Sequence, residues 1–233
     1  MNKELSFKSL ARFTGFAYLA LFIFALIANF MIFENYVIKD NPALTVENLM
    51  NHGFNLRLGT LFFLVIGVLD IFVAWTLYLI FKQINKHISL LSGWLRICYT
   101  ILLLVSIVFL IIVSYLLNPH NDNLIQTFAQ GQIDSLIMIL LLSFNFIWLI
   151  GLAVFGFHLI TIGYLLIKSE KYSKYLGACL TIAGFAYIFD TLANILYSNY
   201  SQHANIFLAI VFIPAIIAEL WFTSWLLYKG FKK

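Results

Sequence analysis

The sequence predicts an all-α fold: an integral membrane bundle of six transmembrane helices, with both termini in the cytoplasm. Of its 233 residues, 63% are hydrophobic and only 10% are charged, whereas soluble domains carry about 25% charged residues. The apolar residues form six long runs, and the basic residues gather in alternate connections between these runs. A chain of this composition cannot cover itself with a solvated surface, so the lipid bilayer is its expected partner.

Six segments reach the length that a helix needs to cross the hydrocarbon core, which is about 20 apolar residues for about 30 Å. In chain order they are 13–33, 58–81, 89–117, 134–167, 176–197 and 206–227. The third and fourth exceed a straight span, so we expect them to tilt or to extend beyond the bilayer. Little chain remains outside the six segments, and residues 1–233 are therefore expected to form a single membrane domain.

The longest connection, residues 34–57, is expected to contain a short helix. Thr45 is placed to cap this helix, which reaches Asn51, and Gly53 is placed to end it. We interpret the helix as a connector lying on the membrane surface, with a lid over the bundle as the alternative.

The basic residues predict the orientation of the spans. With the N-terminus inside, eleven of them lie in inner segments and two in outer segments. The inner ones are Lys3, Lys8, Arg12, Lys82, Lys86, Lys168, Lys171, Lys174, Lys229, Lys232 and Lys233, and the outer ones are Lys39 and Arg57. The positive-inside rule therefore predicts a multi-pass protein of the cell membrane with both termini in the cytoplasm. Basic residues scattered over four short segments argue against a nucleic-acid partner.

The motifs of common soluble enzymes are missing from the sequence. No C-x-x-C, H-E-x-x-H, P-loop or G-x-S-x-G pattern occurs, and we expect no attached soluble catalytic module. We therefore expect a non-enzyme, name no catalytic residue and predict no cofactor. A metal site needs at least three converging ligands, and the His, Asp and Glu residues inside the spans lack the i, i+3 or i, i+4 spacing that favours one, so no metal site is predicted.

Four ionisable side chains interrupt the apolar segments: Asp70, Arg96, His158 and Glu219. A charge at the centre of a span costs roughly 2.5–3.5 kcal/mol on insertion scales, so such residues persist where they are paired, neutral or in a polar cavity. The helical rise of 1.5 Å per residue places them about 18, 14, 15 and 15 Å from the inner basic flanks. Because the four residues come from four different helices and share one depth, we predict that they form a binding site.

Two kinds of role are open for these residues. Asp70 and Arg96 lie on consecutive antiparallel helices, so a charge-assisted pair that fixes helix packing is expected. Glu219 follows Pro214 by five residues, and a proline inside a helix removes a backbone hydrogen bond and favours a kink. A contact between Glu219 and His158 would give a pair able to shuttle a proton.

Asp190 and Arg57 are secondary candidates for binding. Asp190 lies about 24 Å from its inner flank and so nearer the outer face than the other four. A tyrosine or asparagine neighbour, such as Asn194, is its expected partner.

Short ordered fragments along nearly the whole chain carry a family resemblance. They are Ala11-Arg12 with Gly15 and Tyr18-Leu19; Phe54 with Arg57-Leu58-Gly59; Asp70; Arg96; Phe155-Gly156-Phe157-His158-Leu159 with Gly163-Tyr164; Gly177 with Ala183-Gly184, Tyr187 and Asp190; and Pro214 with Glu219-Leu220 and Trp225. In this order and spacing the chain resembles a bacterial family known as domain of unknown function 4386. The resemblance implies a multi-pass protein of the bacterial inner membrane and brings no activity, substrate or catalytic residue.

Three classes of function are compatible with these features. The first is a membrane protein whose buried polar cluster binds or passes a small molecule or a proton, and this is the class that we favour. The second is a structural or regulatory membrane subunit, in which the charges serve only helix packing. The third is an intramembrane enzyme, which is the weakest because no nucleophile accompanies His158. The sequence does not indicate whether the protein forms a homo-oligomer or binds a partner subunit.

Overall fold

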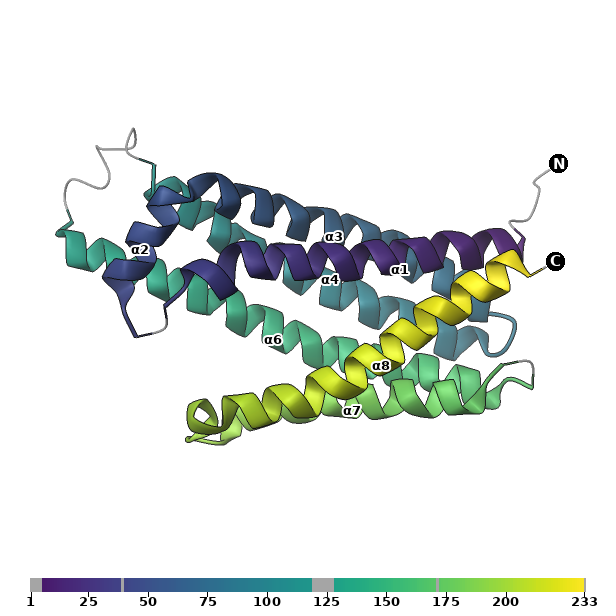
Figure 1. Ribbon diagram of the computed structural model, residues 1–233. Coiled ribbons are helices and arrows are strands. Elements are labelled where there is room, and N and C mark those ends of the chain that lie inside the picture. The colour runs from purple at the N-terminus through teal and green to yellow at the C-terminus, as the bar shows by residue number, and fades with distance from the viewer. Residues whose placement is uncertain (1–5, 39, 119–127, 171, 233) are drawn as a thin grey trace. The chain divides into compact units, whose positions relative to one another are not determined.

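The computed structural model describes residues 6–38, 40–118, 128–170 and 172–232 (Figure 1). All regular structure within these ranges is helical, which confirms the predicted all-α class. The elements are α1 (Phe7–Asn29) with a π-helical turn η1 (Phe30–Glu34), α2 (Pro42–Asn51), α3 (Gly53–Phe81), α4 (Lys86–Leu116), α6 (Gln130–Lys168), α7 (Lys174–Leu196), the 3-10 turn η2 (Tyr200–His203) and α8 (Ala204–Phe231). Four basic flanks used to predict the orientation, Lys3, Lys39, Lys171 and Lys233, lie outside the described residues.

Six of the helical segments in these ranges are long and apolar enough to cross a membrane, as predicted. Each contains most of the expected span and usually extends beyond it: α1 begins at Phe7 rather than at residue 13, and α4 begins at Lys86 rather than at residue 89. Hydropathy finds only the part of a helix that lies in hydrocarbon. Backbone hydrogen bonding continues the helix into the headgroup layer, where the lysine and arginine residues of the first turns can remain solvated.

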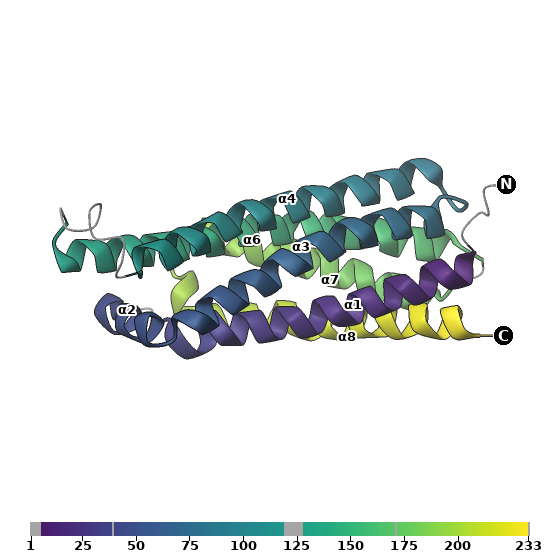
Figure 2. The ribbon, with the colours of Figure 1, turned by 90° about the horizontal axis from the view of Figure 1, so that it is seen from above.

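The described residues pack into two compact units. Unit 1 comprises Met1–Leu21, Leu69–Thr100 and Leu149–Lys233, and unit 2 comprises Phe22–Val68 and Ile101–Trp148. Within unit 1, α7 and α8 run side by side (Figure 1). The first turns of α1 pack against the last turns of α8, where Gly15 lies against Leu227 and Arg12 against Gly230 (Figure 2). The described N- and C-terminal ends therefore lie at the same end of unit 1.

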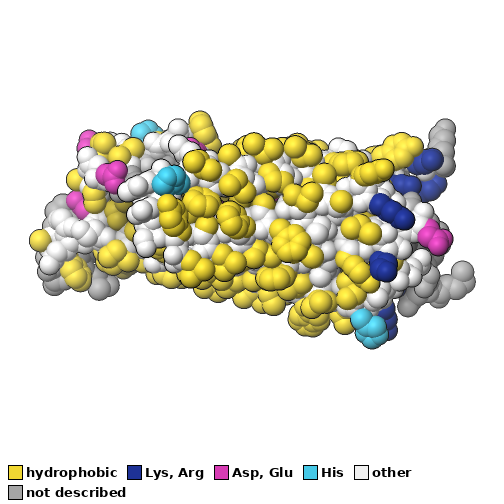
Figure 3. Space-filling view, turned by 90° about the horizontal axis from the view of Figure 1, so that it is seen from below, with side chains coloured by type: hydrophobic (Ala, Val, Ile, Leu, Met, Phe, Trp, Pro, Cys, Tyr) yellow, Lys and Arg dark blue, Asp and Glu magenta, His cyan; other side chains and the backbone are white. Residues whose placement is uncertain are grey.

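Unit 1 also carries almost all of the described basic residues. They are Lys8, Arg12, Lys82, Lys86, Arg96, Lys168, Lys174, Lys229 and Lys232. Except for Arg96, they lie near helix ends or in the connections between helices. Figure 3 shows Lys and Arg side chains gathered toward the right of the view, and hydrophobic side chains over its middle. This is the surface pattern of helices whose sides face lipid and whose ends face water.

Unit 2 contains the predicted short helix, α2, but the residue that caps it is Asn41 and not Thr45. The Asn41 side-chain oxygen accepts a hydrogen bond from the Leu44 backbone N–H at 3.1 Å, and Pro42 occupies the first helical position. Asparagine is among the best N-cap residues and proline suits the position that follows. The helix therefore begins after Asn41 and not after Thr45. Thr45 lies inside α2 and bonds both backbone groups of Ile38. Gly53 begins α3 rather than ending α2.

The contact between α6 and α7 in unit 1 depends on facing glycines. A Cβ atom built at Gly156 would lie 2.5 Å from the Gly184 carbonyl oxygen, and one at Gly177 would lie 2.6 Å from the Gly163 carbonyl oxygen. No side chain fits at either crossing, so the two backbones are in direct contact. Small residues serve this purpose between helices in membranes, where van der Waals packing stabilises the contact.

We expect Gly184→Val to destabilise the protein by about 1–3 kcal/mol, because the new side chain meets backbone that cannot move aside. Thermal unfolding of the detergent-solubilised protein measures this as a lower midpoint. Gly131→Val in α6 is the matched control, since a Cβ atom there would meet nothing within 4 Å. Equal midpoints for the two variants would contradict the close contact.

Candidate functional site

Arg96 is the centre of a buried polar cluster in unit 1. Its Nε donates to Asp70 Oδ1 at 2.9 Å, and Nη2 donates to the same oxygen in a salt bridge. Each of the two side chains is only 2% exposed. Asp70 lies eleven residues before the end of α3 and Arg96 lies ten residues after the start of α4. Two antiparallel helices therefore bring them to the same depth, and the expected pair is present.

His158 and Tyr18 complete the contacts of the guanidinium group. Nη1 of Arg96 donates to the Tyr18 hydroxyl and lies 3.2 Å from His158 Nε2. A guanidinium only donates, so His158 Nε2 accepts and the ring proton lies on Nδ1. Nδ1 is 2.9 Å from both the carbonyl oxygen and the hydroxyl of Ser92, and it donates to this residue. His158 is fully buried, and both of its nitrogens are satisfied.

Two aromatic rings also lie against the guanidinium group of Arg96. The guanidinium carbon of Arg96 lies 4.7 Å from the centre of the Tyr18 ring and 5.4 Å from that of Phe155. Phe155 also stacks on His158, with 5.6 Å between the ring centres. A cation over the face of an aromatic ring is stabilised by about 0.5–2 kcal/mol, with the larger values in desolvated places.

Glu219 has a hydrogen-bond partner of its own. Its carboxylate accepts from the Tyr187 hydroxyl at 3.0 Å, which joins α8 to α7. The hydrogen bonds of His158 go to Arg96 and Ser92 instead and do not join it to Glu219. Tyr187 nevertheless connects the two places, because its ring packs edge-on against Phe155 at 5.6 Å. Glu219 also interacts electrostatically with Arg96, so it belongs to the same polar region.

Neither secondary candidate takes part in these hydrogen bonds. Asp190 on α7 accepts a hydrogen bond from the Tyr200 hydroxyl at 2.8 Å, so a tyrosine is indeed its partner. Arg57 belongs to unit 2, where it lines a cavity with Ser114. In the part of the chain that the structure describes, no group of three His, Cys, Asp or Glu side chains converges on a possible metal position.

Three residues of the site lay outside the set predicted from charge. The sequence indicates Tyr18 and Tyr187 only through the family resemblance, because an uncharged tyrosine cannot be told from the other aromatic residues of this chain. Ser92 precedes Arg96 by four residues, which places both on one face of α4. That spacing is the signal that could have identified it.

The helices and the buried cluster define a class: a multi-pass α-helical membrane protein with ionisable groups inside its spans. Comparison with known families shows to which family the chain belongs. The chain belongs to the family described as Domain of unknown function (DUF4386), whose model matches residues 13–230, and this confirms the resemblance.

The chain is also similar to a protein of Archaeoglobus fulgidus that is described as uncharacterized. The two are 29% identical over 170 residues, which cover 73% of this chain and 82% of that protein. No solved structure matches the chain.

Proposed function

We propose that the protein is a multi-pass protein of the bacterial inner membrane that binds or passes a proton or a small molecule at Glu219. The observation that carries this proposal is the contrast between two acidic groups. Asp70 is held by a cation within a fully buried pair. Glu219 is only partly buried, and its hydrogen-bond partner is the neutral hydroxyl of Tyr187.

This contrast divides the polar residues by role. The Arg96 cluster is closed, because its two charges balance and each of its side chains has a hydrogen-bond partner within the protein. A closed ion pair of this kind fixes helix packing. Glu219 has an acidic group without a cation in contact among the described residues, so it can gain or lose a proton without breaking a salt bridge. The nearby charge of Arg96 supplies a field that acts on this site.

The orientation is part of the proposal. The described inner flanks Lys8, Lys86, Lys174 and Lys229 all belong to unit 1. An excess of basic residues on one side of a membrane is typical of the cytoplasmic side, so we place both termini in the cytoplasm.

A structural or regulatory subunit is the second candidate function. The closed network around Arg96 favours it, because this network needs no ligand to satisfy it. If the protein is a structural subunit, the Glu219 carboxyl is permanently protonated, and its hydrogen bond with Tyr187 only holds α7 to α8.

Difference infrared spectroscopy on the protein in lipid vesicles separates the two functions. We expect a step from mildly alkaline to mildly acidic buffer to produce a protonated-carboxyl band that is lost in Glu219→Gln. Glu170→Gln, which removes an exposed carboxyl between α6 and α7, is the matched control and keeps the band. Identical spectra for the wild type and Glu219→Gln would contradict the proposal and favour the structural subunit.

A further inference from the structure

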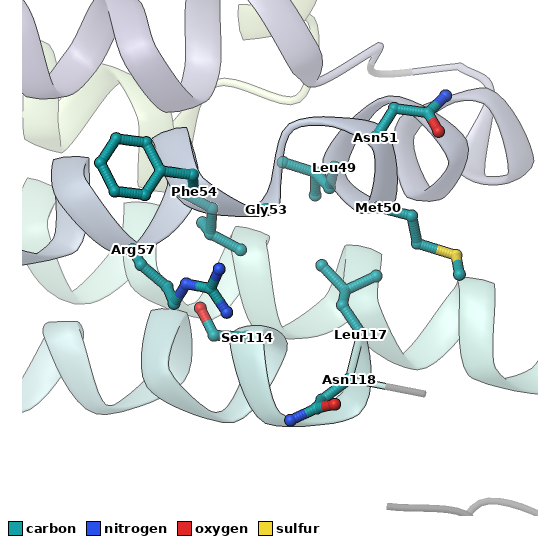
Figure 4. Close-up of a pocket in the computed structure, with 10 residues that line it drawn as sticks. Leu49, Met50, Asn51, Gly53, Phe54, Arg57, Ser114, Leu117 and Asn118 are labelled. Atoms are coloured by element: carbon teal, nitrogen blue, oxygen red, sulfur yellow. The ribbon is translucent and has the colours of Figure 1, made fainter. Parts of the chain in front are cut away.

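Unit 2 contains a cavity of about 340 Å³ formed by the end of α2, the start of α3 and the end of α4. This volume falls within the range of about 300–1,000 Å³ that is common for small-molecule sites. Its lining includes Leu49, Gly53, Phe54, Arg57, Ser114 and Leu117. Figure 4 shows this lining, which includes one cation and no acidic residue.

The polar part of the lining includes an exposed cation, Arg57, and a buried hydroxyl, that of Ser114. Arg57 has no hydrogen bond or salt bridge with any described residue. The Ser114 hydroxyl is buried and has no hydrogen-bond partner in the described part of the chain. The two groups point toward one another in Figure 4. Buried hydroxyls are nearly always satisfied in folded proteins, so an acceptor placed between Arg57 and Ser114 would serve both.

The remaining lining is apolar. Leu49, Phe54 and Leu117 are among the residues that form it. A Cβ atom built at Gly53 would meet nothing within 4 Å, so the space beside this glycine is open. A cation and a hydroxyl beside apolar side chains match a ligand with an anionic head and a hydrocarbon body.

The depth of the cavity agrees with such a ligand. The 29 residues of α3 extend about 44 Å at 1.5 Å per residue. The helix is therefore longer than the hydrocarbon core of about 30 Å by about 7 Å at each end. Arg57 lies four residues, or about 6 Å, after the first residue of α3. This is the level of the lipid headgroups.

We propose that this cavity binds a phosphate or carboxylate group between Arg57 and Ser114, carried by an anionic amphiphile such as an acidic phospholipid. Arginine binds planar or tetrahedral oxyanions through two N–H groups at once, and the serine hydroxyl supplies a third donor. The apolar residues then cover the adjoining part of the hydrocarbon. This site is independent of the role of Glu219.

Binding of short-chain phosphatidylglycerol to the full chain in a nonionic detergent tests the proposal. Phosphatidylcholine of the same chain length and inorganic phosphate are the comparison probes. We expect Arg57→Gln to weaken phosphatidylglycerol binding about tenfold or more, because a charge-assisted hydrogen bond is lost. Gly53→Leu, which fills the open space, and Ser114→Ala should also weaken it. Lys82→Gln makes the same charge change beyond the opposite end of α3 and should leave binding unchanged.

The source of the anion follows from the probes. Tight binding of phosphatidylglycerol with weak binding of inorganic phosphate supports a lipid ligand. Equal, Arg57-dependent binding of inorganic phosphate supports the same anion site with a soluble ligand. The proposal is overturned if Arg57→Gln binds phosphatidylglycerol like the wild type, if Lys82→Gln loses as much affinity, or if phosphatidylcholine binds equally well.

Discussion

Arg96→Met is expected to lower the free energy of unfolding by about 3–5 kcal/mol, because it leaves the Asp70 carboxylate buried without its cation. The same change removes the donor to Tyr18 and to His158. Unfolding in mixed micelles with increasing denaturing detergent measures the loss. Few single changes in this chain are expected to cost as much, since few other side chains are both charged and this deeply buried.

A double variant shows whether the loss belongs to the pair. Replacing both partners of a buried ion pair by apolar residues is often neutral or even stabilising. Arg96→Met combined with Asp70→Leu should therefore cost much less than the sum of the two single changes. Additive losses would mean that Arg96 and Asp70 act separately, and would contradict the pair as the source of stability.

His158→Leu is the change with the second largest expected effect, a loss of about 2 kcal/mol or more. Removing the imidazole leaves an Arg96 side-chain N–H without a partner in a buried place. It also removes the second hydrogen bond of the Ser92 carbonyl oxygen, which still accepts from the backbone of α4. A buried donor without a partner costs about 1–3 kcal/mol. Phe157→Leu is the control on the same helix. Its side chain is 50% exposed in the structure, so the change should stay within about 0.5 kcal/mol.

Circular dichroism and unfolding in mixed micelles give the readout for both variants. His158→Gln should recover part of the stability, because an amide can accept from Arg96 and donate to Ser92. If His158→Leu were as stable as Phe157→Leu, the histidine would not be bound in the way described.

The sequence was sufficient for the helices and for the pairing of Asp70 with Arg96. Long apolar runs locate the spans because a bilayer imposes one length on all of them. Counting the helical rise then placed Asp70 and Arg96 at one level, and these two residues do form a pair.

The rotation of each helix about its axis was beyond the sequence. Rise fixes the depth of a residue, whereas its direction depends on how neighbouring helices pack. For this reason the shared depth of His158 and Glu219 could not show whether they form a pair: His158 bonds Arg96 and Ser92. Glu219 bonds Tyr187 on the neighbouring helix. The N-cap was missed for a local reason, since Asn41 and Thr45 are both suitable capping residues and only backbone geometry distinguishes them.

The facing glycines of α6 and α7 have a consequence for how this family can vary in length. The pairs Gly156–Gly184 and Gly163–Gly177 are separated by seven residues on each helix. Inserting one residue between the two glycines of either helix would turn the far glycine by about 100° and destroy one crossing. His158 lies between the two crossings and Tyr187 lies three residues beyond one of them. Relatives that keep both glycine pairs must therefore confine insertions and deletions to positions outside residues 156–163 of α6 and 177–184 of α7. The fixed spacing of these glycines then fixes the heights of His158 and Tyr187 along their helices.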